Sequence, residues 1–319
     1  MFPGALLLAD GRQSIVLLIR QHGWKRIWIP EYFCYEVIGS IEDQTGIRVM
    51  YYEENPMREA AVENLPFAAG DVLLRVNFFG LRGFRSNRGI PCPVIEDHTH
   101  DLLGPWAAHS DADWCIASLR KTLPVPEGGM LWSPKGLPLP AEVRGTEENE
   151  RIAATRWEGM ALKARYLDGA AVRKEDFRKC YTETEEWFDH ALPVAIDDRS
   201  RAFLSQELDL ERWQDAKRSN WCLLRELVRG CDVLAPEEEA CTAFSLVLLF
   251  ESRERRDEVR KQLIGKAVYP AILWAVPDGV SGASKDFSGR MLSVHCDGRY
   301  SGQDIRQLAG MLNKLLESK

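Results

Sequence analysis

The chain has 319 residues, of which 45% are hydrophobic and 28% are charged, and its formal net charge is −7. This is an ordinary globular composition, and the length suits two domains. The acidic balance and the lack of a Lys/Arg block argue against nucleic acid as a partner, and no apolar run approaches the roughly 20 residues that a membrane span needs.

The first residues and the cysteines indicate the compartment. Segment 1–8 is apolar but lacks the basic residues that begin a signal peptide, and Asp10 soon follows. We therefore interpret it as mature protein and not as a signal peptide. The eight cysteines are scattered and form no CxxC pair. This spacing is typical of free thiols in a cytoplasmic protein and argues against a zinc site, so we expect no metal.

In the first half of the chain, strand-like and helix-like segments alternate. Helical spacing is expected over 13–22 and 35–42. The expected strands are short apolar runs at 26–30, 47–52, 71–77, 93–96, 114–117 and 129–132. Strands that alternate with helices indicate an α/β fold, with a largely parallel sheet covered by helices on both faces.

The second half has a different pattern. From about 147 to 228 charged residues dominate and the spacing is helical. After this segment the expected elements are strands at 243–250 and 291–295 and amphipathic helices at 254–263 and 302–316. These elements predict a smaller α+β domain at the C-terminal end.

An acid and a lysine follow two of the expected strands. Asp97 comes directly after 93–96, and Lys121 comes shortly after 114–117. The carboxyl ends of parallel strands face the ligand crevice of such a sheet, so both side chains are expected to reach one crevice. Gly128 and Gly129 follow and allow the chain to reverse beside it.

Pyridoxal phosphate (PLP) needs this set of groups. A lysine amine binds the cofactor aldehyde, and a carboxylate keeps the pyridine nitrogen protonated so that the ring accepts electrons. A phosphate needs amides at a helix N-terminus, which Gly11, Arg12 and Gln13 offer, together with a hydroxyl such as that of Ser118. His100 is the expected partner of the ring oxygen, with a satisfied core histidine as the alternative.

Several segments resemble, in the same order, motifs of the DegT/DnrJ/EryC1/StrS family of PLP-dependent sugar aminotransferases. Two are specific: Glu-Asp-His-Thr-His at 96–100, and Ser-Leu-Arg-Lys at 118–121 followed by Glu-Gly-Gly. The others are the glycine turn at 11–14, the proline-aromatic segment at 28–35 and, more weakly, 292–304. Together they span most of the chain.

The resemblance implies a fold-type I PLP-transferase. The large domain, 1–185, would hold a mostly parallel seven-stranded sheet flanked by helices, and the smaller α+β domain would cover 186–319. Lys121 would hold PLP as a Schiff base and Asp97 would pair with the pyridine nitrogen. The resemblance further implies a homodimer, glutamate as the amino donor and a nucleotide-linked keto sugar as the acceptor.

Four further residues are candidates for the site. The ring-stacking position of the family falls near Cys34 here, so Tyr32 or Tyr35 is expected to stack on PLP; both could also be core aromatics. Asn77 is either a turn former or a substrate contact. Arg299 is either a solvated surface residue or the partner of a substrate carboxylate, which its planar fork suits.

Two other functions stay open. The first is another PLP reaction on the same fold, such as an elimination, a dehydration or a carbon–sulfur lyase reaction. The second is a non-catalytic member of the fold, against which the presence of both Asp97 and Lys121 argues. Conversion of bound PLP to pyridoxamine phosphate by glutamate distinguishes transamination from the first alternative.

Overall fold

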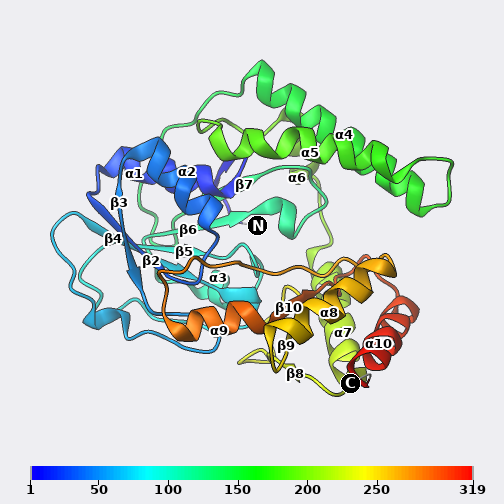
Figure 1. Ribbon diagram of the computed structural model, residues 1–319. Helices are drawn as coiled ribbons and strands as arrows, with labels where there is room; N and C mark the ends of the chain where they lie inside the picture. The colour runs from blue at the N-terminus through cyan, green and yellow to red at the C-terminus, as the bar shows by residue number, and fades with distance from the viewer. Residues whose placement is uncertain (1, 318–319) are drawn as a thin grey trace.

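The computed structural model describes residues 2–317 and contains a large and a small β-sheet with helices packed around them (Figure 1). The large sheet has seven strands in the order β1-β7-β6-β5-β4-β2-β3. Its strands are β1 (Leu6–Leu8), β2 (Arg26–Pro30), β3 (Arg48–Tyr52), β4 (Asp71–Val76), β5 (Val94–Asp97), β6 (Trp114–Ser118) and β7 (Gly129–Trp132). Strands β2 to β6 are mutually parallel, and β7 runs antiparallel to them. β1 pairs antiparallel with β7 and therefore runs in the same direction as β2 to β6, which confirms the mostly parallel seven-stranded sheet.

The large sheet is buried on both faces. Alternate residues of one strand belong to different apolar clusters: Val72 and Leu74 of β4 pack on one side, and Leu73 packs on the other. Successive side chains of a strand point to opposite faces, so two clusters mean two covered faces. This is why the strands read as continuous apolar runs in the sequence.

Helices α1 (Gly11–His22) and α2 (Tyr35–Thr45) follow the first two strands and pack against each other. The Asp10 side chain caps α1 by accepting a hydrogen bond from the Gly11 amide, and Gly23 ends the helix in the left-handed conformation. A short helix, α3 (Pro105–His109), lies between β5 and β6, and 3-10 segments follow β4 (Phe78–Gly80) and β6 (Leu119–Lys121).

Residues 147–227 are largely helical, as the charge pattern predicts. Two long helices, α4 (Glu147–Leu167) and α5 (Lys174–His190), pack side by side along the upper edge of Figure 1. Helices α6 (Asp198–Leu204) and α7 (Leu210–Leu227) follow. The predicted domain boundary after residue 185 lies inside α5, so the division into 1–185 and 186–319 stays a prediction.

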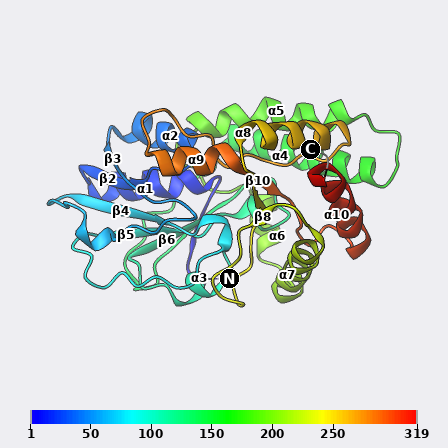
Figure 2. The same ribbon diagram turned by 60° about the horizontal axis from the view of Figure 1, so that its bottom comes forward.

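The small sheet is antiparallel, in the order β10-β9-β8. Its elements and helices are β8 (Asp232–Val233), β9 (Leu246–Leu249), α8 (Arg253–Gly265), α9 (Gly282–Arg290), β10 (Met291–Val294) and α10 (Gly302–Glu317). Figure 2 shows α7 and α10 side by side against this sheet. The predicted strand 243–250 is shorter than expected, because residues 243–245 form no strand.

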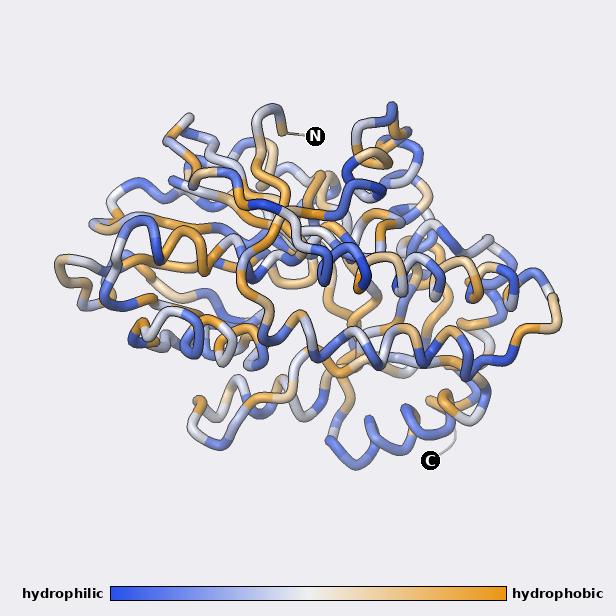
Figure 3. Tube along the Cα trace, turned by 90° about the horizontal axis from the view of Figure 1, so that it is seen from above, coloured by the Kyte–Doolittle hydropathy of each residue, from blue (hydrophilic) through white to orange (hydrophobic). Residues whose placement is uncertain are grey.

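The apolar core lies between the sheets and their helices. Figure 3 shows that apolar residues gather in the middle of the molecule, whereas the peripheral helices are largely polar. Within residues 2–317, no helix has the length and apolar character required to cross a membrane.

Candidate functional site

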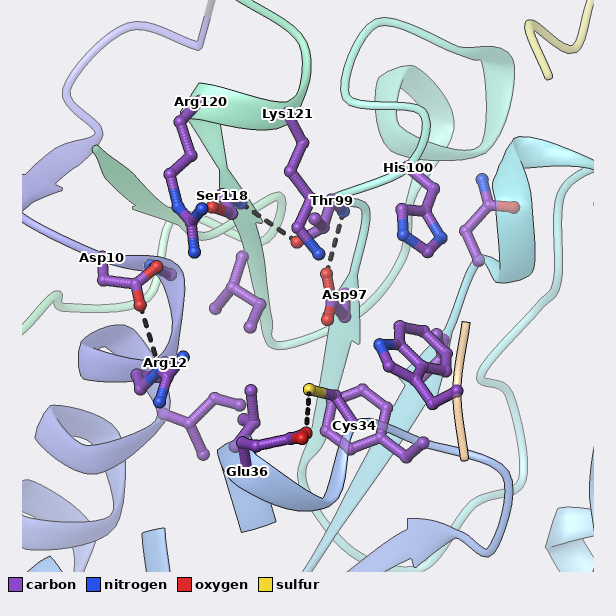
Figure 4. Close-up of a pocket in the computed structure, with 18 of the residues that line it drawn as sticks. Asp10, Arg12, Cys34, Glu36, Asp97, Thr99, His100, Ser118, Arg120 and Lys121 are labelled. Carbon is purple, nitrogen blue, oxygen red and sulfur yellow. Dashed lines mark hydrogen bonds and ion pairs between the residues drawn. The ribbon is translucent and has the colours of Figure 1, made fainter. Parts of the chain in front are cut away.

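A cavity of about 310 Å³ lies where β4, β5 and β6 end and α1 and α2 begin. Figure 4 shows its lining side chains converging from these elements. The volume is within the range of small-molecule sites. The predicted residues that line it are Gly11, Arg12, Asn77, Asp97, His100, Ser118 and Lys121. Strand ends and one helix start therefore bring distant parts of the sequence together.

Lys121 ends the 3-10 turn that follows β6 and points into this cavity (Figure 4). The turn is held by the Leu119 amide, which donates to the Gly128 carbonyl at 2.7 Å. Burial lowers the pKa of the Lys121 amine, and the positive charge of Arg120 lowers it further, against the opposite effects of Cys34, Asp97 and Asp10. A lowered pKa increases the fraction of neutral, nucleophilic amine.

Asp97 is the last residue of β5, and its side chain faces the same space as that of Lys121 (Figure 4). One of its oxygens, Oδ1, accepts a hydrogen bond from the Thr99 amide at 2.8 Å. The Thr99 hydroxyl in turn accepts from the Ser118 amide at 3.0 Å. These two bonds fix the carboxylate relative to the end of β6, and so relative to the turn that carries the lysine.

His100 is a buried, neutral histidine in the wall of the cavity. Burial and the charges of Lys121 and Lys217 hold its pKa well below the usual value. Its Nδ1 accepts a hydrogen bond from the Phe79 amide at 3.1 Å, so in the neutral ring Nε2 carries the proton. Nε2 has no partner among the residues that the structure describes. The ring stacks on Phe244, with centroids 4.5 Å apart.

The start of α1 lies against the end of β6. A Cβ at Gly11 would meet atoms of Ser118 at 3.2 Å, so only glycine fits there without a shift. The Ser118 hydroxyl and the Arg120 Nε find no partner within residues 2–317. Both are therefore free donors beside the helix N-terminus, where an anion is favoured. The Asp10 carboxylate binds the first amide of α1 at 2.7 Å and the Arg12 Nε at 2.9 Å.

Three predicted site residues lie elsewhere. The Gln13 side chain bonds to Leu192 and Val194, and its amide donates to the Asp10 carbonyl at 3.2 Å, so Gln13 does not line the cavity and its predicted phosphate contact stays a prediction. Tyr32 and Tyr35 do not line the cavity. The Tyr32 hydroxyl bonds to the backbone of Leu273 and Trp274, and the Tyr35 hydroxyl donates to the Glu31 carbonyl.

The reason is the direction in which each side chain leaves the backbone. In the segment that contains both tyrosines, Phe33 and Cys34 face the cavity instead. The Cys34 thiol donates to Glu36 at 3.1 Å, and burial raises its pKa to about 11, so it stays protonated. Trp274, from the C-terminal half, adds a large flat wall. Phe33 and Trp274 are thus the aromatic surfaces that the cavity offers.

Comparisons with known proteins address the fold. No family model matches the chain, and no curated protein matches it by sequence. Solved structures do match over nearly the whole chain. One match is Spr1654 from Streptococcus pneumoniae, which is assigned as a sugar aminotransferase and was solved in PLP and PMP forms. Its PLP form gives a TM-score of 0.68 at 12% identity, over 99% of this chain and 87% of that chain. The chain has the fold of the fold-type I aminotransferases.

Two further aminotransferase structures agree with this fold. A DegT DnrJ EryC1 StrS aminotransferase from Brucella abortus gives a TM-score of 0.64 at 13% identity, over 98% of this chain and 86% of that chain. Helicobacter pylori PseC, an aminotransferase of pseudoaminic acid biosynthesis, gives 0.65 at 12% identity, over 99% and 87%. The sequence prediction of a fold-type I architecture is confirmed.

Other residues of this aminotransferase fold reach the cavity without a sequence motif of their own. Glu185 and Asp189 come from α5, and their carboxylates pair with Arg120 and Arg12 respectively. Nothing in the sequence could place α5 there, because its docking is a tertiary contact. Arg120 is different, since its position next to Lys121 was a usable signal.

A second cavity, of about 410 Å³, also borders Arg120 and Lys121. Arg299, the predicted carboxylate partner, lines this cavity and not the first one. Its fork is already filled, because Nε and Nη2 each donate to a different oxygen of Asp297 at 2.7 Å. Arg299 thus lies beside the candidate cofactor site, and its charge is already paired with Asp297. Its predicted role as the partner of a substrate carboxylate stays a prediction.

Proposed function

We propose that this chain is a PLP-dependent aminotransferase that moves an amino group from an amino acid to a keto acceptor. The observation that carries the proposal is one cavity in which Lys121, Asp97 and His100 meet, on a fold shared with PLP-dependent aminotransferases. Lys121 would hold the cofactor as an imine, and Asp97 would pair with its pyridine nitrogen.

The unmet hydrogen-bonding capacity of the cavity fits PLP. Buried polar atoms almost always have a partner, so donors left without one mark where a ligand binds. Here these donors are the His100 Nε2, the Ser118 hydroxyl and the Arg120 Nε. His100 suits the ring oxygen, and the other two suit a phosphate beside the Arg12 backbone, since the Gly11 amide already donates to the Asp10 carboxylate. Trp274 or Phe33 would cover the ring in place of the tyrosines.

The chemistry is divided between the cofactor and the chain. When bound, PLP supplies an electrophilic carbon and an electron-accepting ring. The Lys121 amine, whose pKa burial lowers, would hold that carbon of the cofactor in its neutral, nucleophilic form. The same Nζ, when not holding the cofactor, would serve as the base that accepts a proton from the donor carbon and as the acid that gives it back. The Asp97 carboxylate balances positive charge at the ring nitrogen throughout.

The substrates and the assembly belong to the same proposal. We take glutamate as the donor and a nucleotide-linked keto sugar as the acceptor; in support, several similar structures are sugar aminotransferases, and DesI was solved with its TDP-sugar product. Asn77, whose Nδ2 lacks a partner within residues 2–317, would contact the substrate. We also propose a homodimer and a cytoplasmic location, which the resemblance and the scattered cysteines of the sequence support.

Absorbance spectroscopy tests the proposal. Purified protein should show a visible band on addition of PLP, and Lys121→Ala should lose it, whereas Lys261→Ala, at an exposed position on α8, should keep it. Adding L-glutamate should remove the band and release one equivalent of 2-oxoglutarate. A band unaffected by Lys121→Ala would refute the lysine assignment. Removal of the band with release of ammonia instead would favour an elimination.

A further inference from the structure

Lys217 is a buried lysine that the mechanism above does not use. It lies on α7, is 7% exposed and lines the second cavity, which Lys121 also borders. Its ammonium donates only to the Thr242 carbonyl, at a long 3.5 Å, and no acidic side chain within residues 2–317 lies within 4.0 Å of it. A buried ammonium with so little compensation is costly.

Arg120, Arg156 and Arg299 of this cavity already pair with carboxylates, and Lys121 is the residue proposed to hold the cofactor, which sets Lys217 apart. The Arg156 guanidinium bonds to Glu185 at 2.9 Å, and that of Arg299 is held by Asp297. Burial lowers the pKa of the Lys217 amine, and the charge of Asp101 opposes this effect most. The Asp101 carboxylate itself accepts a hydrogen bond from the Thr242 amide at 3.2 Å, and burial raises its pKa to about 6. A bound anion would favour the charged form of Lys217. The structure thus keeps one cation available at the wall of this cavity.

Lys217 is also close to the groups that surround Lys121. Its Nζ lies 5.5 Å from the centroid of the Phe244 ring, and that ring stacks on His100 at 4.5 Å. The charges of Lys121 and Lys217 both act on His100, which therefore lies near each of them. A small molecule that reacts at Lys121 can consequently extend into the space beside Lys217.

We propose that Lys217 binds the carboxylate of the amino donor whose amino group reacts at Lys121. This inference rests on the proposed aminotransferase function and names the residue that recognises the donor. A carboxylate is favoured over a phosphate because Lys217 offers one positive charge to one negative charge, while Asp101 and Asp297 in the same wall would disfavour the second charge that a phosphate carries on the same group. A charge-assisted hydrogen bond of this kind contributes about 1.5–3 kcal/mol, which corresponds to about 10- to 100-fold in affinity.

The test compares Lys217→Met and Lys217→Arg with the exposed control Lys261→Met. Each PLP-loaded protein is titrated with glutarate, which has the carboxylates of glutamate but no amine, with the neutral diamide of glutarate, and with a nucleoside diphosphate. Binding is followed by calorimetry. The concentration of L-glutamate that half-saturates the loss of the visible band is measured in parallel. Circular dichroism establishes that each variant is folded.

We expect Lys217→Met to weaken glutarate and glutamate binding about 10- to 100-fold, with the neutral diamide unchanged, and Lys217→Arg to restore part of the affinity. Equal glutarate affinity in Lys217→Met and the wild type would overturn the proposal. So would a loss of affinity for a nucleoside diphosphate with glutarate unaffected, since the anion would then be a phosphate. A wild-type protein without a visible band would instead refute the aminotransferase function itself, and with it the assignment to an amino donor.

Discussion

Replacing Glu127 by glutamine should change how the stability of the protein depends on pH. Glu127 precedes the two glycines beside Lys121 and is 0% exposed. Its Oε1 accepts a hydrogen bond from the Asp197 amide at 2.7 Å, whereas Oε2 has no partner within residues 2–317. Burial raises the pKa of this carboxyl to about 9, and the charge of Asp197 adds to the rise. The side chain is therefore protonated at neutral pH.

The sign and size of the effect follow from this raised pKa. The folded state holds the proton up to about pH 9, whereas the unfolded chain releases it near the ordinary glutamate pKa of 4.5. Glu127 thus contributes stability that is fully present below the unfolded pKa and is lost as pH rises towards 9. Between those limits the loss is about 1.4 kcal/mol per pH unit, so about 3 kcal/mol between pH 6.5 and pH 8.5.

Urea unfolding at pH 6.5 and 8.5 measures this term. Glutamine keeps an oxygen for the Asp197 amide and does not titrate, so Glu127→Gln should remove about 3 kcal/mol of pH dependence from the free energy of unfolding. The window avoids Asp101, whose pKa is raised only to about 6. Other titrating groups are common to both proteins and cancel in the difference. Identical pH dependence in the two proteins would show that Glu127 is ionised in the folded state.

Two predictions concern the cofactor site. Asp97→Asn should keep the visible PLP band, because Lys121 is intact. The loss of this band on addition of L-glutamate should be slower by about 100-fold or more in stopped-flow measurements, since a neutral amide does not stabilise a positive ring nitrogen. An unchanged rate would contradict the pairing of Asp97 with the ring nitrogen. Ser118→Ala removes a hydroxyl that lacks a protein partner and should weaken PLP binding about 10- to 100-fold in an absorbance titration, with no loss of thermal stability. A drop in stability with unchanged PLP affinity would mean that this hydroxyl has a structural role.

The large sheet was predictable because most of its strands are short apolar runs bounded by polar, glycine or proline residues in the sequence. The expected strands at 26–30 and 129–132 agree with β2 and β7 to the residue, and 114–117 lacks only the last residue of β6. β1 was not predicted, because three leucines in a row carry no period that distinguishes a strand. The same holds for β8, which has two residues and depends on its pairing with β9.

The site was predictable to the extent that strand ends determine it. Asp97 and Lys121 lie where their strands place them, and His100 follows the same strand end as Asp97. Tyr32 and Tyr35 were expected to stack on the cofactor but do not line the cavity. The sequence cannot show which of the four neighbouring side chains, 32–35, faces the cavity. Lys217 on α7 and the acids Glu185 and Asp189 on α5 were not predicted as site residues for a different reason. Their helices reach the site only through tertiary packing, which no sequence motif indicates.

The position of the 3-10 turn after β6 explains why one lysine can serve two ligands. Of the residues that the structure describes, Arg120 and Lys121 are the ones that border both cavities. The free donors of the first cavity suit an aromatic ring with a phosphate, whereas the free cation of the second suits a carboxylate. Lys121 lies where these two spaces meet, with the turn fixed by the bond from Leu119 to Gly128. Under the proposed function, this arrangement would let a cofactor bind in the first cavity and the carboxylate of a donor in the second, with the reacting atoms of both beside the Lys121 amine.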